Sequence, residues 1–281
     1  PAVAPTTEND LQQQGTPVLD SFKRPLLSND TKTAIVCAKK LMTSATNDED
    51  KAALEKIGSN SKDPTPEDVE AGSKAIVNQL QEKQNVTFAL MLLRLVVLHP
   101  GTTDDNGDSS HVLACLRWVQ NELITSEHSG SNSSSALTTA AARSMAWCVL
   151  SNALGGAATS SSLDNSSVLT DSTVEAALAD IVQDSSHQPR VEVRQAAAAF
   201  LYNVALLESK KLLVGESSGC DEELPDRVVS LLCASLDGVA QDEPDTTTQL
   251  RRILVAARLV KPLNCDTVIQ PAKTLVQDLG F

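Results

Sequence analysis

Segments with helical spacing follow one another along most of this chain, and no strand pattern competes with them. The clearest lies at 190–208, where apolar residues recur every three or four positions and form one stripe: Val193, Ala196, Ala197, Phe200, Leu201, Val204 and Leu207. Aromatic residues make up only 2% of the sequence, and Ala and Leu dominate the apolar runs. This composition favours stacked helices over sheets.

The expected helices occupy 31–45, 48–58, 66–81, 86–98, 110–126, 136–154, 171–183, 190–208, 224–237, 247–260 and 267–279. Three segments are apolar nearly all round, at 86–98, 140–154 and 247–260, and should be inner helices covered on more than one side. Successive inner helices are about 45–55 residues apart, which is typical of an α-solenoid built from repeats of two or three helices. The Pro-, Thr- and Gln-rich residues 1–17 are expected to be a disordered linker before the folded domain, 18–281.

Charge and composition exclude several classes of function. The net charge of −13 argues against general nucleic-acid binding, which needs a basic surface. No apolar run reaches the ~18 residues of a membrane span. The six cysteines are widely spaced without a Cys-x-x-Cys pair, and we expect free thiols in a reducing compartment. The dispersed histidines predict no metal site.

Two arginines stand inside apolar helical segments. Arg94 has Leu90, Met91, Val97 and Leu98 as helical neighbours, and Arg252 lies in a similar run. Because a charge is costly to remove from water, each must reach an internal acid or face a groove that binds an anionic partner. Arg251 and Arg258, seven residues apart on one helix face, are expected to form a solvated stripe or rim.

Two asparagines also occur within apolar helices, although Asn is a mediocre helix former. The side chains of Asn152 and Asn203 can donate and accept hydrogen bonds, so they either clamp the backbone of an extended peptide or bond a loop carbonyl or a neighbouring helix end. Arg143 is a weaker groove candidate. Trp147 either lines an apolar pocket for a ligand or belongs to the core.

Four fragments in this order resemble one family, the PUL domain. They are the helix ending in His-Pro at 87–100 with Arg94, the segment 147–153 with Asn152, the Ala-rich helix 194–207 with Asn203, and the run 250–260 followed by 272–280. The resemblance covers roughly residues 18–281. The chain departs from the family at Cys148, where an Arg is usual, and at Arg258, where a small residue is usual, so one groove contact is in doubt.

The resemblance implies an all-α, armadillo-like solenoid of about six helical repeats. It implies a non-catalytic adaptor without cofactor that captures the acidic C-terminal tail of valosin-containing protein, a hexameric AAA segregase. This role belongs to ubiquitin-dependent protein handling, in the cytoplasm or also the nucleus, and the isolated domain would be monomeric. The implied peptide-binding residues are Arg94, Arg252, Asn152, Asn203, Arg143 and Trp147.

Two other classes of function stay open. An armadillo-type scaffold for another partner would share the fold and differ only in its ligand. A cysteine enzyme with Cys148 or Cys37 as nucleophile would need a neighbouring His, and none lies near Cys148 in sequence.

Overall fold

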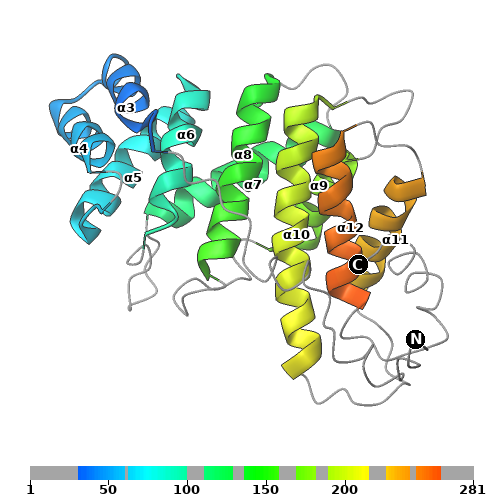
Figure 1. Ribbon diagram of the computed structural model, residues 1–281. Helices are drawn as coiled ribbons and strands as arrows, with labels where there is room; N and C mark the ends of the chain where they lie inside the picture. The colour runs from blue at the N-terminus through cyan, green and yellow to red at the C-terminus, as the bar shows by residue number, and fades with distance from the viewer. Residues whose placement is uncertain are drawn as a thin grey trace, which may run out of the picture.

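The computed structural model describes residues 31–60, 63–99, 111–128, 136–157, 169–181, 189–214, 226–240 and 245–260. Within these ranges the chain forms ten α-helices and no strand, which confirms the predicted all-α class (Figure 1). The helices are α3 (Ala34–Met42), α4 (Asp48–Ser59), α5 (Pro66–Gln81), α6 (Val86–Val96), α7 (His111–His128), α8 (Ala140–Ala157), α9 (Asp171–Ile181), α10 (Val191–Val214), α11 (Asp226–Ala240) and α12 (Thr246–Val260). The predicted linker at 1–17 and the helix at 267–279 lie outside the described residues.

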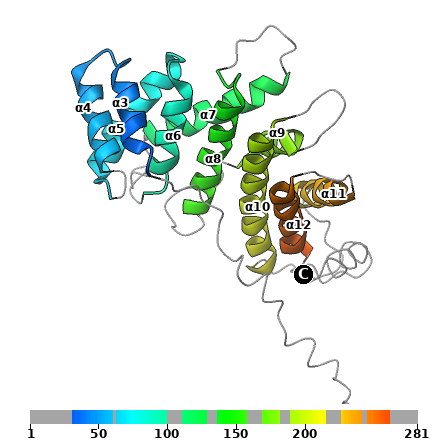
Figure 2. The same cartoon turned by 45° about the horizontal axis from the view of Figure 1, so that its top comes forward.

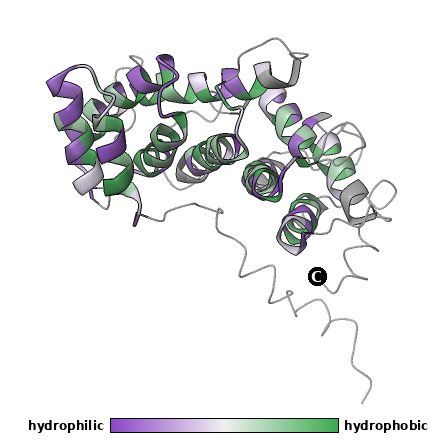
Figure 3. Cartoon of the chain, turned by 90° about the horizontal axis from the view of Figure 1, so that it is seen from above, coloured by the Kyte–Doolittle hydropathy of each residue, from purple (hydrophilic) through white to green (hydrophobic). Residues whose placement is uncertain are grey.

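The helices form two parallel rows. The inner row consists of α3, α6, α8, α10 and α12, each packed on the next, and the outer row consists of α4, α5, α7, α9 and α11. Every inner helix also packs on an outer one, as the neighbouring ribbons in Figures 1 and 2 show. Seen from above, the rows bend with the inner row on the inside of the curve (Figure 3). This arrangement is that of an armadillo-like α-solenoid, while the exact number of repeats stays a prediction.

Capping residues explain where two of the outer helices begin. The Thr65 hydroxyl accepts a hydrogen bond from the Asp68 N–H at 3.2 Å, and Pro66 occupies the first turn of α5. Asn47 caps α4 in the same way by accepting from the Asp50 N–H at 2.6 Å. Such caps satisfy N–H groups that the helix itself leaves without a partner. The bounds predicted for α5, 66–81, are confirmed.

A single core runs through both rows from α3 to α12. The apolar stripe predicted on α10 is entirely buried within it. Figure 3 shows hydrophobic residues where helices face each other and hydrophilic residues on outward sides. At the N-terminal end α3 and α4 approach each other closely. A Cβ added at Gly58 would stand only 2.4 Å from the Cβ of Ala38. Glycine at this position therefore sets the spacing between α4 and α3.

Candidate peptide-binding site

Asparagine side chains join successive helices of the inner row. The Asn152 amide on α8 donates to the backbone carbonyl of Arg94 on α6 at 2.6 Å. The Asn203 amide on α10 donates to the backbone carbonyl of Ser151 on α8 and to its hydroxyl, both at 2.9 Å. Both asparagines are buried. Of the two interpretations left open by the sequence, the structure shows bonds to a neighbouring helix, and a contact with a peptide stays a prediction.

We expect Asn203→Ala to lower the free energy of unfolding by about 1–3 kcal/mol, because the substitution leaves a buried carbonyl and hydroxyl without their donor. Urea denaturation followed by circular dichroism measures this loss. Asn121→Ala is the matched control, since Asn121 is exposed on α7. There the better helix propensity of Ala should raise stability by a few tenths of a kcal/mol. Equal effects of the two substitutions would contradict a bridging role for Asn203.

The two arginines of the apolar segments are buried, with exposed fractions of 5% for Arg94 and 4% for Arg252. The guanidinium of Arg252 donates to the carbonyl of Ala234 on α11 at 2.7 Å and to that of Ile181, the last residue of α9, at 3.4 Å. Arg252 thus points from the inner row into the outer row and bonds backbone oxygens there. Arg94 lies on α6, which packs on the preceding inner helix α3, and its charge acts to lower the pKa of the Cys37 thiol there.

Arg143 and Trp147 converge on one buried acid, Asp180 of α9. The Arg143 Nε and the Trp147 Nε1 each donate to the same oxygen, Oδ2, at 2.6 Å. Trp147 is fully buried and its ring lies 5.2 Å from that of Phe200. Of the two interpretations of Trp147, the core position is the one that the structure shows. Asp180 was not predicted as a site residue from the sequence. Its position after the apolar residues Ala176, Ala177 and Leu178 could have indicated a buried ion pair.

The expectation of a solvated stripe or rim is wrong for Arg258, which is buried, whereas Arg251 is partly exposed. Arg258 is 8% exposed and lies beside Tyr202. Burial raises the pKa of the Tyr202 hydroxyl, while the charge and a hydrogen bond of Arg258 act in the opposite direction. Arg251 is partly buried, and its guanidinium donates to the backbone carbonyl of Gln195 on α10. The periodicity placed both residues on one helix but could not show that neighbouring helices cover them.

The described cysteines are free thiols. Cys37 is buried, and its Sγ lies 3.9 Å from the Sδ of Met91. Burial raises the pKa of the Cys37 thiol, with smaller opposing effects from Thr33 and Arg94. A raised thiol pKa opposes nucleophilic attack, which requires the thiolate. Cys148 is only partly exposed.

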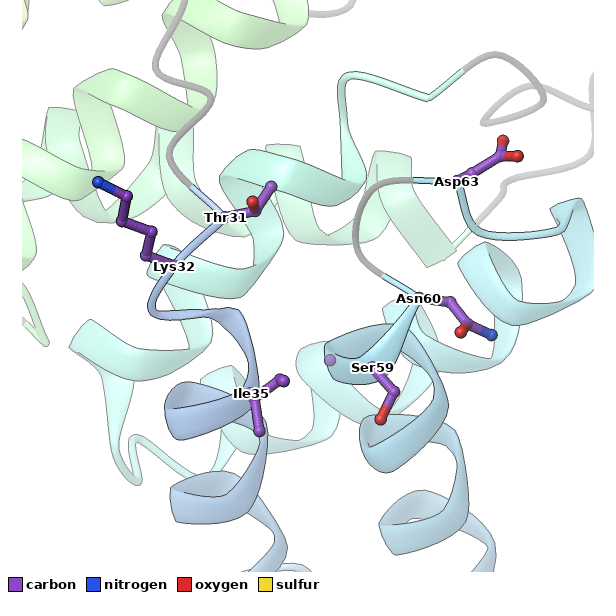
Figure 4. Close-up of a pocket in the computed structure, with 7 residues that line it drawn as sticks. Thr31, Lys32, Ile35, Ser59, Asn60 and Asp63 are labelled. Carbon is purple, nitrogen blue, oxygen red and sulfur yellow. The ribbon is translucent and has the colours of Figure 1, made fainter.

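A hollow of about 570 Å³ lies elsewhere, between the start of α3 and the end of α4. Ile35 and Ser59 lie on opposite sides of it, and the charged ends of Lys32 and Asp63 point away from each other (Figure 4). Binding pockets normally bring a few polar groups together around a ligand. None of the predicted site residues lines this hollow, so it does not contribute to the candidate site.

The two rows of helices and the polar contacts between them identify the class of protein. It is an α-solenoid with a curved inner face. A family model described as the PUL domain matches residues 34–258, and the chain belongs to this family. It is therefore a protein-interaction domain of a helical family that is not known for enzymatic activity. Neither a curated protein nor a solved structure gives a significant match. Within the described ranges, no helix is long and apolar enough to span a membrane.

Proposed function

We propose that this domain is an adaptor that captures the acidic C-terminal tail of valosin-containing protein during ubiquitin-dependent protein handling in the cytoplasm. Membership of the PUL family is the observation that carries the proposal, because domains of this family bind other proteins. The particular partner comes from the resemblance of the sequence to adaptors of this segregase.

The inner row is the surface that suits a tail. Its helices stand side by side on the inside of the bend, so that a peptide laid across them contacts several repeats at once (Figure 3). The chain as a whole carries a charge of −13, which repels an acidic peptide. Capture therefore requires cationic side chains close to the inner row, and Arg94, Arg143 and Arg252 all belong to inner helices.

We place the six predicted residues in or beneath this peptide site: Arg94, Arg252, Asn152, Asn203, Arg143 and Trp147. Each has a partner within the fold. For Arg252, contact with a tail requires the guanidinium to exchange the carbonyl oxygens of Ile181 and Ala234 for the carboxylates of a peptide, which are stronger acceptors. The asparagines and Trp147 support the surface by holding α6, α8, α9 and α10 together.

A peptide corresponding to the tail is expected to bind the wild-type domain with a roughly micromolar Kd. Arg94→Ala or Arg252→Ala should weaken binding, each by on the order of 1–3 kcal/mol, as a charge-assisted contact is lost. Isothermal titration calorimetry measures the affinity, and circular dichroism confirms that each variant stays helical. Arg117→Ala, at an exposed position of the outer helix α7, should bind as the wild type does.

Absence of binding to the wild-type domain would contradict the proposed partner. An affinity that is unchanged in both the Arg94 and Arg252 variants would remove these two arginines from the site and leave the partner in place. A pull-down from cell extract, probed for the segregase, separates the proposal from a scaffold for another partner. Recovery of other proteins without the segregase would favour the scaffold.

A further inference from the structure

Arg251 occupies a junction of three inner helices. It lies on α12, its Nη1 donates to the backbone carbonyl of Gln195 on α10, and it is near enough to Cys148 on α8 that a negative charge on that thiol would raise the pKa of Arg251. These three helices stand next to one another in the inner row (Figures 1 and 2). A peptide that crosses this part of the row would pass this guanidinium.

The direction of Arg251 differs from that of its neighbour Arg252. Adjacent residues of a helix point about 100° apart around its axis. Arg252 reaches the outer helices α9 and α11 through the carbonyls of Ile181 and Ala234. Within the described residues, the hydrogen bond of Arg251 goes to the inner helix α10, and Arg251 is less buried than Arg252. The guanidinium of Arg251 therefore lies against a neighbouring inner helix, whereas that of Arg252 lies against the outer row.

The guanidinium of Arg251 retains most of its hydrogen-bonding capacity. An arginine has five N–H donors, and within the described part of the chain the bond to Gln195 is the one that Arg251 makes. The charge of Asp245 acts on Arg251, and the two oxygens of Asp245 accept bonds from the Gln195 amide at 3.0 Å and from the Thr248 N–H at 2.7 Å. Burial lowers the pKa of Arg251, opposed by Cys148 and Asp245, yet an arginine stays protonated.

We propose that Arg251 forms a carboxylate subsite on the inner face, where it binds an acidic side chain of the captured peptide. This inference rests on the proposed function and adds a specificity-determining residue to it. Leu250, the residue before Arg251 on α12, is 38% exposed, and Val191, one turn before Gln195 on α10, is 42% exposed. Apolar side chains are therefore exposed within one helical turn of both residues of the Arg251–Gln195 bond.

An acidic side chain fits this subsite better than the terminal carboxylate of a chain does. Terminal carboxylates are usually captured by several free backbone N–H groups. Arg251 lies in the second turn of α12 and Gln195 in the second turn of α10, where N–H groups are already bonded within the helix. A guanidinium can bind a carboxylate bidentately without such N–H groups, and the carboxylate of an acidic side chain needs no further donors.

The test uses the tail peptide in three forms: unmodified, with its C-terminus amidated, and with its acidic side chains changed one at a time to amides. Fluorescence anisotropy gives the Kd of each form for the wild type, Arg251→Gln, Arg251→Lys and the outer-face control Arg117→Gln. We expect Arg251→Gln to bind the unmodified peptide about tenfold more weakly, which corresponds to ~1.4 kcal/mol. The Kd of Arg251→Lys should lie between those of the wild type and Arg251→Gln, because lysine keeps the positive charge but lacks the planar, bidentate donor group of arginine.

One acid-to-amide peptide should bind Arg251→Gln and the wild type equally, since that peptide already lacks the partner of Arg251. If instead the peptide with the amidated C-terminus is the one that binds Arg251→Gln and the wild type equally, Arg251 contacts the terminal carboxylate. That result would overturn the assignment to an acidic side chain. Unchanged binding by Arg251→Gln, with normal wild-type affinity, would overturn the subsite and leave the proposed function standing. If the wild type binds none of the peptides, the proposed function fails, and the subsite fails with it.

Discussion

Asp180→Ala should be among the most destabilising single substitutions in this domain, with a loss of about 3 kcal/mol or more in the free energy of unfolding. Asp180 is buried, and its Oδ2 accepts hydrogen bonds from the Arg143 Nε and the Trp147 Nε1, both at 2.6 Å. Removing one partner from a buried ion pair leaves the other charge without compensation, at a cost of roughly 3–5 kcal/mol. The Arg143 side chain is 14% exposed, so water offsets part of this cost. Guanidinium chloride denaturation measures the change.

The same helix provides a matched control. Asp171 begins α9 and pairs with Arg227 at 2.5 Å, but its side chain is 77% exposed. Exposed ion pairs contribute little because water and salt screen them, and Asp171→Ala should cost less than about 1 kcal/mol. If Asp180→Ala and Asp171→Ala lower the free energy of unfolding equally, burial does not explain the contribution of the Asp180 ion pair to stability.

Trp147→Ala should cost about 3–5 kcal/mol, the range for deleting a large aromatic side chain from a core. Trp147 is fully buried, packs against Phe200 and donates its indole N–H to Asp180. Trp147→Phe should cost less, since it keeps an aromatic ring in the core, although it removes the N–H donor and part of the indole volume. Chemical denaturation of the two variants measures both losses.

Trp118 is the control for this second prediction. It is partly exposed on α7, so Trp118→Ala should lose less stability than Trp147→Ala. The comparison also bears on function. A loss of tail affinity in Trp147→Phe without a loss of stability would show that Trp147 contacts the peptide, which its buried position in the structure does not indicate.

The helices could be predicted from the sequence because the signals that define them are local. Apolar periodicity, the Thr65 cap and Pro66 lie within a few residues of the helix that they specify, and α5 was predicted at its exact bounds. Elsewhere the ends differ by a few residues, as for α10, which continues to Val214 beyond the predicted 208. Nothing in its apolar stripe marks a stop, and the continuation 209–214 contains good helix formers.

The partners of the site residues could not be predicted, because they are distant in sequence. Asn152 and Arg94 are 58 residues apart, and Arg252 is 71 residues from Ile181. The sequence showed that these polar side chains require partners. It could not distinguish a neighbouring helix from a peptide, since both present the same carbonyl oxygens. Only the packing of the two rows decides which carbonyl comes within reach.

The asparagine bonds between inner helices have a consequence for how the repeats can diverge. Their acceptors on Arg94 and Ser151 include main-chain oxygens, which every amino acid possesses. Substituting the residue that accepts leaves the backbone bond available, provided that the helix keeps its course. Individual repeats can therefore drift in sequence while the spacing of the array persists, which makes this domain a suitable scaffold for exchanging repeats between distant relatives.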